Sequence, residues 1–327
     1  MKIALDVMGF ENDTAEAIKA ARKFSKKFTD TKIVLVGDIQ QIIKHLKIEN
    51  EFEIVNSTQV ITMEDNPIHA LRKIDSSMYK AIKLVKTNHV DGVLSAGSTS
   101  CFVPMVYSLM GLIEGIKKTP FMPFIPTVDK VGFNMLDVGA NINVTGGDLY
   151  QFALMGNIYA KEVRKIANPK IGIVNIGTEH HKGFEYHREA YDLLKADSRI
   201  NFIGFVEPKY LIAGSCDVAV CDGYTGNITL KSLEGSFRSV AKILGKSYKK
   251  PWNWLGALFS IGTIKSLVST FDFRNNAGAL VLGAKGVAVK THGSADSKQF
   301  YSSLCMTRDA ILSDITNKIK EQVNVNK

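Results

Sequence analysis

The sequence predicts an α/β protein, a three-layer α/β/α fold built on a mostly parallel sheet. Short runs rich in Ile, Val and Leu recur along the 327 residues, and each of them ends in Gly, Ser, Asp or Asn. Segments long enough to form helices separate these runs. Strands that alternate with helices build a parallel sheet whose faces are covered by the helices. We therefore expect a single α/β/α domain over residues 1–327.

The predicted strands follow one another along the whole chain. The apolar runs that indicate them lie at residues 2–7, 31–37, 51–57, 90–97, 170–177 and 216–223. Residues 132–141 and 285–290 indicate two more. The Pro-rich stretch 119–127 can be a linker between two domains or part of one interwoven domain. We favour one domain, because strand-like sequence follows this stretch directly.

Two helices have clear signals of their own. Asp13 can cap a helix, with Glu16 three residues later, as in a capping box. One apolar face of this helix is formed by Ala17, Ile18, Ala21, Phe24 and Phe28. The last helix is predicted to start at about Asp296. Its apolar side is formed by Phe300, Leu304, Ile311, Ile315 and Ile319.

Composition limits the class of protein. The formal charge of +9 indicates acidic partners, but the lysines are spread out and no nucleic-acid-binding motif accompanies them, so nucleic acid is disfavoured. The start of the sequence lacks the apolar core of a secretory signal, which favours a cytoplasmic protein. Four scattered cysteines predict no metal site. Neither a Walker loop nor a G-x-G-x-x-G fingerprint is present, so no nucleotide cofactor is expected.

The loops after the strands are the candidate site, because ligands bind open parallel sheets beyond the carboxyl ends of the strands. Six such loops combine glycine with Ser, Thr, Asn, Asp or His. They lie at residues 6–9, 95–100, 137–141, 175–181, 221–227 and 290–296. We expect them to converge on one crevice, since parallel strands end at the same edge of a sheet.

The segment Cys221–Lys231, "CDGYTGNITLK", predicts a strand, a tight turn and a helix start. Free backbone N–H groups at such a start bind anions, and Lys231 one turn later can add a charge. The alternative is an ordinary tight turn followed by a solvated lysine. His292 lies in the last glycine loop, where it can be a functional group or a hydrogen-bonded loop residue.

A second feature is an amphipathic segment at about residues 249–272, which contains both tryptophans. It can lie at a membrane interface, with Trp252, Trp254, Leu258 and Phe259 in contact with lipid. It can equally be a subunit interface or a core helix. Too few apolar residues follow one another for a membrane span. Gly256 and Gly262 predict a break into two short helices.

Eight motifs together resemble a known family, the bacterial acyl-acyl carrier protein:phosphate acyltransferases (the PlsX enzymes of phospholipid synthesis). Taken singly the strings are weak, but in this order and spacing they are highly specific. They lie at residues 4–9, 66–78, 93–100, 136–141, 151–156, 175–179, 220–235 and 291–293.

The resemblance implies an enzyme that moves a fatty acyl group from acyl carrier protein to inorganic phosphate. The acyl phosphate would then serve a glycerol-3-phosphate acyltransferase at the membrane. The resemblance also implies a fold similar to that of isocitrate and isopropylmalate dehydrogenases, a homodimer, and peripheral association with an anionic membrane surface. No cofactor is implied.

The family motifs also imply roles for residues. The expected catalytic residues are His292, Lys231, Asn227 and Asp222, with His292 as oxyanion donor or as the acid for the leaving thiolate. The expected phosphate-site residues are Asp6, Gly9, Asp75, Ser95, Gly97, Thr99, Asn141, Gly223, Thr225 and Gly226. Asp6 and Asp222 are expected to orient other groups, and Asp75 to help dock the carrier protein or close the site.

The chain departs from the family pattern at three places. Phe10 replaces a usual glycine, Ser98 and Ser100 replace an amide and a glycine, and Ile74 stands where a lysine is usual. Two other functions therefore stay open. One is a phosphotransacylase that uses coenzyme A thioesters, and the other is a catalytically weakened, membrane-bound scaffold of the same family.

Overall fold

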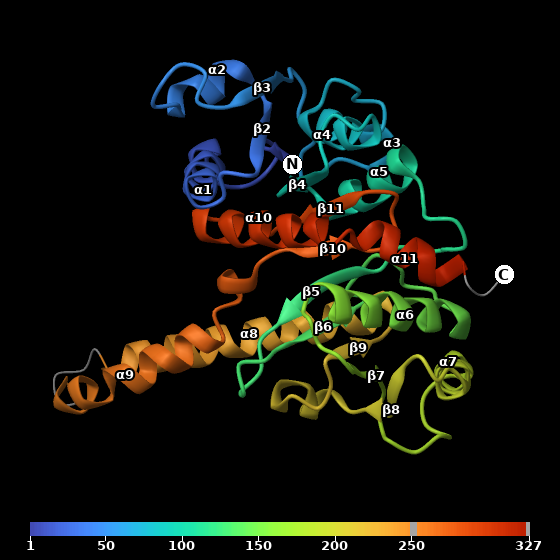
Figure 1. Cartoon of the computed structure of the whole chain (residues 1–327). Helices are drawn as coiled ribbons and strands as arrows, with labels where there is room; N and C mark the ends of the chain where they lie inside the picture. The colour runs from blue at the N-terminus through green and yellow to red at the C-terminus, as the bar shows by residue number, and fades with distance from the viewer. Residues whose placement is uncertain (249–253, 325–327) are drawn as a thin grey trace.

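The computed structural model describes residues 1–248 and 254–324, and Figure 1 shows helices packed on both faces of a central sheet. The predicted α/β/α fold with a mostly parallel sheet is confirmed. Within the described residues the strands are β1 Lys2–Asp6, β2 Lys32–Gly37, β3 Glu53–Asn56, β4 Gly92–Ser95, β5 Phe121–Ile125, β6 Phe133–Leu136, β7 Lys170–Val174, β8 Asn201–Val206, β9 Val218–Val220, β10 Ala279–Val281 and β11 Val287–Lys290. The helices are α1 Thr14–Lys27, α2 Ile39–Ile42, α3 Pro67–Ala70, α4 Ser77–Lys86, α5 Thr99–Met110, α6 Gly146–Glu162, α7 Glu185–Ala196, α8 Gly223–Tyr248, α9 Trp254–Thr270, α10 Ser297–Leu312 and α11 Ile315–Asn324. Short 3-10 helices are η1 Ile43–His45, η2 Pro208–Ala213 and η4 Phe273–Asn276.

The two halves of the sheet run in opposite directions. The strand order is β3-β2-β1-β4-β11-β10-β5-β6-β9-β7-β8. β1, β4 and β11 are parallel, β10 and β5 each reverse the direction, and β6 is antiparallel to β5. The loops after β1, β4 and β11 therefore leave one edge, and those after β6, β7 and β9 leave the opposite edge. The expectation that all six loops share one edge is wrong.

The Pro-rich stretch is not a linker. Its residues 121–125 form β5, which pairs with β10 on one side and β6 on the other. Both neighbours are antiparallel to β5, so this strand and β10 cause the change of direction. Neither β5 nor β10 was predicted, and β8 was also missed.

The start of α1 agrees with the boundary predicted from the sequence, and the end of the predicted last helix does not. Asp13 caps α1, accepting from the Ala15 N–H. Glu16 does not complete a capping box: its carboxylate accepts from Ser297 N–H at 2.6 Å and so supports the start of α10. The predicted last helix is interrupted at Asp314, whose φ of 52° is left-handed, so α10 and α11 are separate.

Helices α8 and α9 project from the body of the molecule (Figure 1). α9 runs from Trp254 to Thr270 as one helix through Gly256 and Gly262, so the predicted break is wrong. Isolated glycines lower helix stability without ending a helix. At 26 residues α8 is about 39 Å long. This length lets a helix that starts at one sheet edge reach the loops at the other.

Candidate active site

The loops after β1, β4 and β11 form one cluster. Backbone bonds join them, from Glu11 N–H to Gly293 O at 2.8 Å and from Thr291 N–H to Ser95 O at 2.9 Å. Gly9 has φ +73°, and a Cβ there would lie 2.4 Å from the Ile61 carbonyl oxygen. Only glycine fits this position without strain. The substituted Phe10 next to it packs edge-on against Phe300, with centroids 5.1 Å apart, and so ties the loop to α10.

Asp6 organises this cluster from within. Its carboxyl group is 1% exposed and accepts from the Ser95 hydroxyl at 2.7 Å and from Met8 N–H at 3.2 Å. Ser95 Oγ in turn accepts from Gly97 N–H at 3.1 Å. Burial raises the pKa of Asp6 to about 6, although hydrogen bonds from Ser77, Ser95 and Met8 oppose this. The predicted residues Asp6, Ser95 and Gly97 therefore lie together, with Asp6 placed to orient the others.

The raised pKa of Asp6 leads to a stability prediction. The pKa of Asp6 in the folded protein, about 6, lies above the ordinary 3.8, so ionisation of this carboxyl group disfavours the folded state. The stability that the protonated carboxyl group contributes is therefore lost as pH rises through 6. The free energy of unfolding should fall by about 2 kcal/mol more in wild type than in Asp6→Asn between pH 4 and pH 7. Urea unfolding of both proteins at the two pH values measures this. Parallel pH profiles would contradict the assignment.

The loops after β6 and β9 form a second cluster around the start of α8. Asp222 accepts from Thr225 N–H at 2.9 Å and from the Thr225 hydroxyl at 2.7 Å. Gly223 N–H bonds Asn141 O at 2.8 Å, and a Cβ at Gly226 would lie 1.9 Å from Asp137 O. The start of α8 is thus packed tightly and already carries an anionic cap, which opposes a second anion there.

Helix α8 carries candidate site residues from this cluster toward the first one. Asn227, Leu230, Lys231 and Glu234 follow at spacings of three and four residues, so they share one face. Lys231 is exposed. Burial raises the pKa of Glu234, and the nearby charges of His292, Arg238 and Lys231 lower it. Glu234, which was not predicted, therefore lies within electrostatic reach of both His292 and Lys231.

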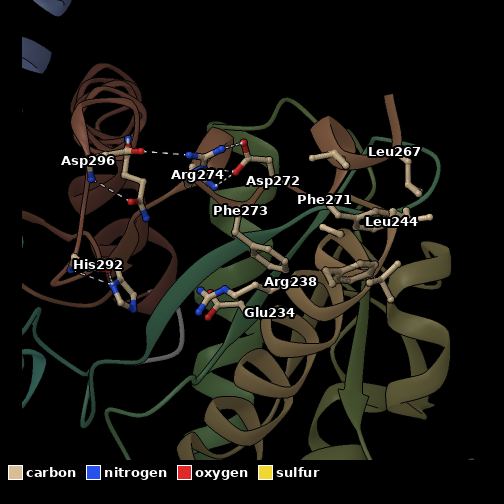
Figure 2. Close-up of a pocket in the computed structure, with 16 residues that line it drawn as sticks. Glu234, Arg238, Leu244, Leu267, Phe271, Asp272, Phe273, Arg274, His292 and Asp296 are labelled. Carbon is tan, nitrogen blue, oxygen red and sulfur yellow. Dashed lines mark hydrogen bonds and ion pairs between the residues drawn. The ribbon is translucent and has the colours of Figure 1, made fainter. Parts of the chain in front are cut away.

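His292 is exposed, and its ring is held by its own loop. Nδ1 accepts from Ser294 N–H at 3.1 Å and lies 2.8 Å from the Ser294 hydroxyl. Since Nδ1 accepts a backbone N–H, the neutral ring carries its proton on Nε2. Figure 2 shows this ring facing Glu234 and Arg238 of α8 across a pocket. Nε2–H is available to donate to a bound molecule.

Two cavities meet at His292. A larger one of about 530 Å³ runs along α8 and α9 (Figure 2), and a smaller one of about 160 Å³ lies toward the sheet. Both are lined by Glu234, Phe273, His292 and Gln299. Thr99 and Leu230 line the smaller cavity, together with Lys290 and Thr291.

The walls of the larger cavity are mostly apolar away from His292. Its apolar lining residues are Phe237, Val240, Ala241, Leu244, Leu267, Val268, Phe271 and Phe273. Phe237 and Phe271 stack with ring centroids 4.0 Å apart. Near His292 the lining becomes polar. Burial of Asp272 in this part of the lining would raise the pKa of its carboxyl group. Hydrogen bonds from Arg274 and Lys298 outweigh burial and lower this pKa to about 2.

Lys290 and Thr291 lie in the candidate loop at residues 290–296, but neither was predicted as a site residue. The available signal was a lysine that closes the apolar strand "VAVK" at a buried position next to His292. Charged side chains are almost never fully buried unless paired. A lysine in the middle of a sheet therefore marks a site candidate.

The remaining predicted residues lie elsewhere. Asp75 accepts from Thr58 N–H at 2.9 Å and pairs with Lys80, and the Lys80 contact, followed by those of Thr58, holds its pKa well below the usual range. It stabilises the loop before α4. Trp252 lies outside the described residues, Trp254 and Leu258 belong to α9, and the Phe259 side chain is 88% exposed. Of the helices that the structure describes, none is long and apolar enough to cross a membrane.

Comparison with known proteins identifies the family. A family model described as fatty acid synthesis protein matches residues 1–318. The chain belongs to this family. It is 51% identical over 323 residues to the phosphate acyltransferase of Malacoplasma penetrans, covering 98% of both chains. It is 43% identical over 331 residues to that of Mycoplasma genitalium, covering 99% of this chain and 98% of the relative.

Solved structures show the same fold at low sequence identity. A phosphotransacetylase from Streptococcus pyogenes superposes with a TM-score of 0.66 at 16% identity, covering 95% of this chain and 94% of the other. A 4-hydroxythreonine-4-phosphate dehydrogenase from Klebsiella pneumoniae has a TM-score of 0.56 at 11% identity, covering 95% and 98%. Both agree with the α/β/α fold class.

Proposed function

We propose that this enzyme transfers a fatty acyl group from the thioester of acyl carrier protein to inorganic phosphate. Phosphate acyltransferase activity follows from the family and from the names of its relatives. The observation that carries the finer proposal is the junction at His292, where an apolar groove meets a small cavity whose lining is mostly apolar but includes the polar residues Thr99, Lys290 and Thr291. An acyl chain fits the former and phosphate the latter.

The groove between α8 and α9 suits a fatty acyl chain. Its volume of about 530 Å³ is typical of ligand sites, and its apolar walls lead directly to His292. With the chain in the groove, the thioester carbonyl lies at the His292 end. The stacked Phe237 and Phe271 form part of the wall.

The reaction needs positioning more than proton removal. A phosphate oxygen attacks the thioester carbonyl carbon, the C–O bond forms, and the C–S bond breaks as the oxyanion collapses. His292 Nε2–H is placed to stabilise that oxyanion or to protonate the leaving thiolate. We place phosphate in the smaller cavity, between Thr99 at the start of α5 and the α8 residues Leu230 and Glu234. Asn227 and Lys231 share that face of α8 but are not among the lining residues of either cavity.

Trapping the product tests this function. Purified enzyme, acyl carrier protein thioester and phosphate should give an acyl phosphate that hydroxylamine converts to a hydroxamate. No hydroxamate above a no-enzyme control would contradict the proposal. Coenzyme A thioester in place of the carrier thioester decides between the two donors.

Charge supports the carrier protein as donor. Arg238, Lys242 and Lys246 are exposed and four residues apart, so they form a basic strip along α8 beside the groove. An acidic carrier protein would be steered to such a strip, and its binding should weaken as salt rises.

A groove-blocking substitution separates long from short acyl donors. Ala241→Trp should lower kcat/KM about 100-fold for a sixteen-carbon donor, because excluding three or four methylenes costs about 0.8 kcal/mol each. A four-carbon donor should change less than threefold. Ser239→Trp, which places the same side chain on the exposed opposite side of α8, is the control. Equal losses for both donors would place the acyl chain elsewhere.

We also propose peripheral membrane association and a homodimer, both involving α8 and α9. Ile243, Phe259 and Ile261 expose large apolar side chains there, at 64%, 88% and 50%. Either lipid or a second copy would cover such a surface. Flotation with anionic vesicles and sedimentation without lipid distinguish the two.

The scaffold alternative requires vesicle binding with no turnover. At the membrane, the acyl phosphate would pass to a glycerol-3-phosphate acyltransferase.

A further inference from the structure

Lys290 is buried at the floor of the smaller cavity. It ends β11, pairs in register with Ser95 of β4, and is 6% exposed. Nζ donates to the Thr291 carbonyl oxygen, and among the described residues it makes no ion pair. Burial lowers the pKa of Lys290 to about 8, although the charge of Glu11 opposes this. A buried amine without a carboxylate partner is costly, so the fold retains it for a reason other than stability.

Thr291 adds an unsatisfied polar group to the same cavity. The residue is 2% exposed, and its Oγ1 has no hydrogen-bond partner among the described residues. Its backbone N–H is already used, donating to Ser95 O at 2.9 Å. Buried hydroxyls are almost always bonded, so an unsatisfied one at a cavity indicates a missing partner.

The start of α5 also faces this cavity. Thr99, the first residue of the 12-residue helix, lines it. The preceding Ser98 makes no side-chain cap bond, and its hydroxyl instead lies 2.8 Å from that of Ser100. The first backbone N–H groups of α5 are therefore left without a side-chain acceptor. Such N–H groups, with the helix dipole, favour an anion.

Together these three features are rich in donors. We propose that the floor of the smaller cavity is the phosphate subsite, with Lys290 Nζ and Thr291 Oγ1 contacting phosphate oxygens and the start of α5 completing the site. This inference rests on the proposed function and extends it to two residues of the last glycine loop that were not predicted as site residues. The volume of about 160 Å³ admits inorganic phosphate and is below the size of typical nucleotide or coenzyme sites.

The subsite lies next to the groups required for transfer. His292 follows Thr291 directly in the chain and lines both cavities. A phosphate on Lys290 would thus lie beside the carbonyl at the end of the acyl groove. Among the described lining residues Glu234 is the one acidic group, and its burial, which raises its pKa, reduces repulsion of phosphate.

Kinetics with varied phosphate test the subsite. Lys290→Met should raise the KM for phosphate about 100-fold and Thr291→Val about tenfold, as expected for loss of a charged and a neutral hydrogen bond. The KM for the acyl donor should stay within threefold. Lys285→Met, an exposed lysine five residues earlier, is the matched control and should leave both values unchanged. An unchanged phosphate KM in Lys290→Met would overturn the inference.

Binding measured without turnover separates this inference from the proposed function. Inorganic phosphate alone should raise the melting temperature of wild type and Lys285→Met, but not that of Lys290→Met. If wild type makes no acyl phosphate yet shows this pattern, the subsite stands and the function fails. If wild type is active and phosphate stabilises all three proteins equally, the subsite fails. Should Lys290→Met not fold, Thr291→Val decides by the same measurements.

Discussion

Replacing His292 by alanine should lower kcat by about 10²- to 10³-fold, the range for loss of a general acid or an oxyanion donor. The KM values for phosphate and donor should change much less, since the contact of His292 Nε2 is made chiefly in the transition state. Ser294 holds the ring through Nδ1, so Ser294→Ala should give a smaller loss of about tenfold.

Steady-state rates with saturating phosphate measure this effect, and His181→Ala, an exposed histidine outside both cavities, is the control. His292→Gln distinguishes the two roles. An amide can donate to an oxyanion but cannot protonate a thiolate, so partial activity in His292→Gln indicates the oxyanion role. A kcat within threefold of wild type in His292→Ala would place the chemistry elsewhere.

Lys290→Met should stabilise the protein by about 3 kcal/mol at pH 7, although it weakens phosphate binding. The folded pKa of about 8 lies below the ordinary 10.5, so the charged form is disfavoured in the folded state. This penalty is complete below pH 8 and disappears as pH rises toward 10.5. The stability difference between Lys290→Met and wild type should therefore shrink over the same interval.

Denaturant unfolding at pH 7 and pH 10, without phosphate, measures the difference. Lys285→Met, which is exposed, should stay within about 0.5 kcal/mol of wild type at both pH values. A less stable Lys290→Met would show that the ammonium has a stabilising partner inside the protein and is not reserved for a ligand.

Features that depend on neighbouring residues were predictable from the sequence. Asp13 caps α1 as expected, and a strand and a helix flank Cys221 as predicted. The reason is that caps, turns and hydrophobic periodicity involve residues only a few positions apart. The family motifs likewise located His292 and the loops after β1, β4 and β11. The predicted glycine turn is wrong, because α8 already begins at Gly223 and both glycines lie in its first turn.

Strand direction and burial could not be predicted in this way. β5 begins in a Pro-rich stretch and β10 is only three residues long, yet these two strands reverse the sheet and separate the six loops into two clusters. Short strands have weak local signals, and the pairing of β5 with β10 joins residues more than 100 positions apart.

The sequence alone determined most of the elements, the family and the importance of the loops around His292. The tertiary structure alone decided that α8 spans from one loop cluster to the other and that Glu234 approaches His292. It also decided that Lys290 is buried without a carboxylate partner. Burial and electrostatic environment arise from packing between distant segments, and no short stretch of residues encodes them.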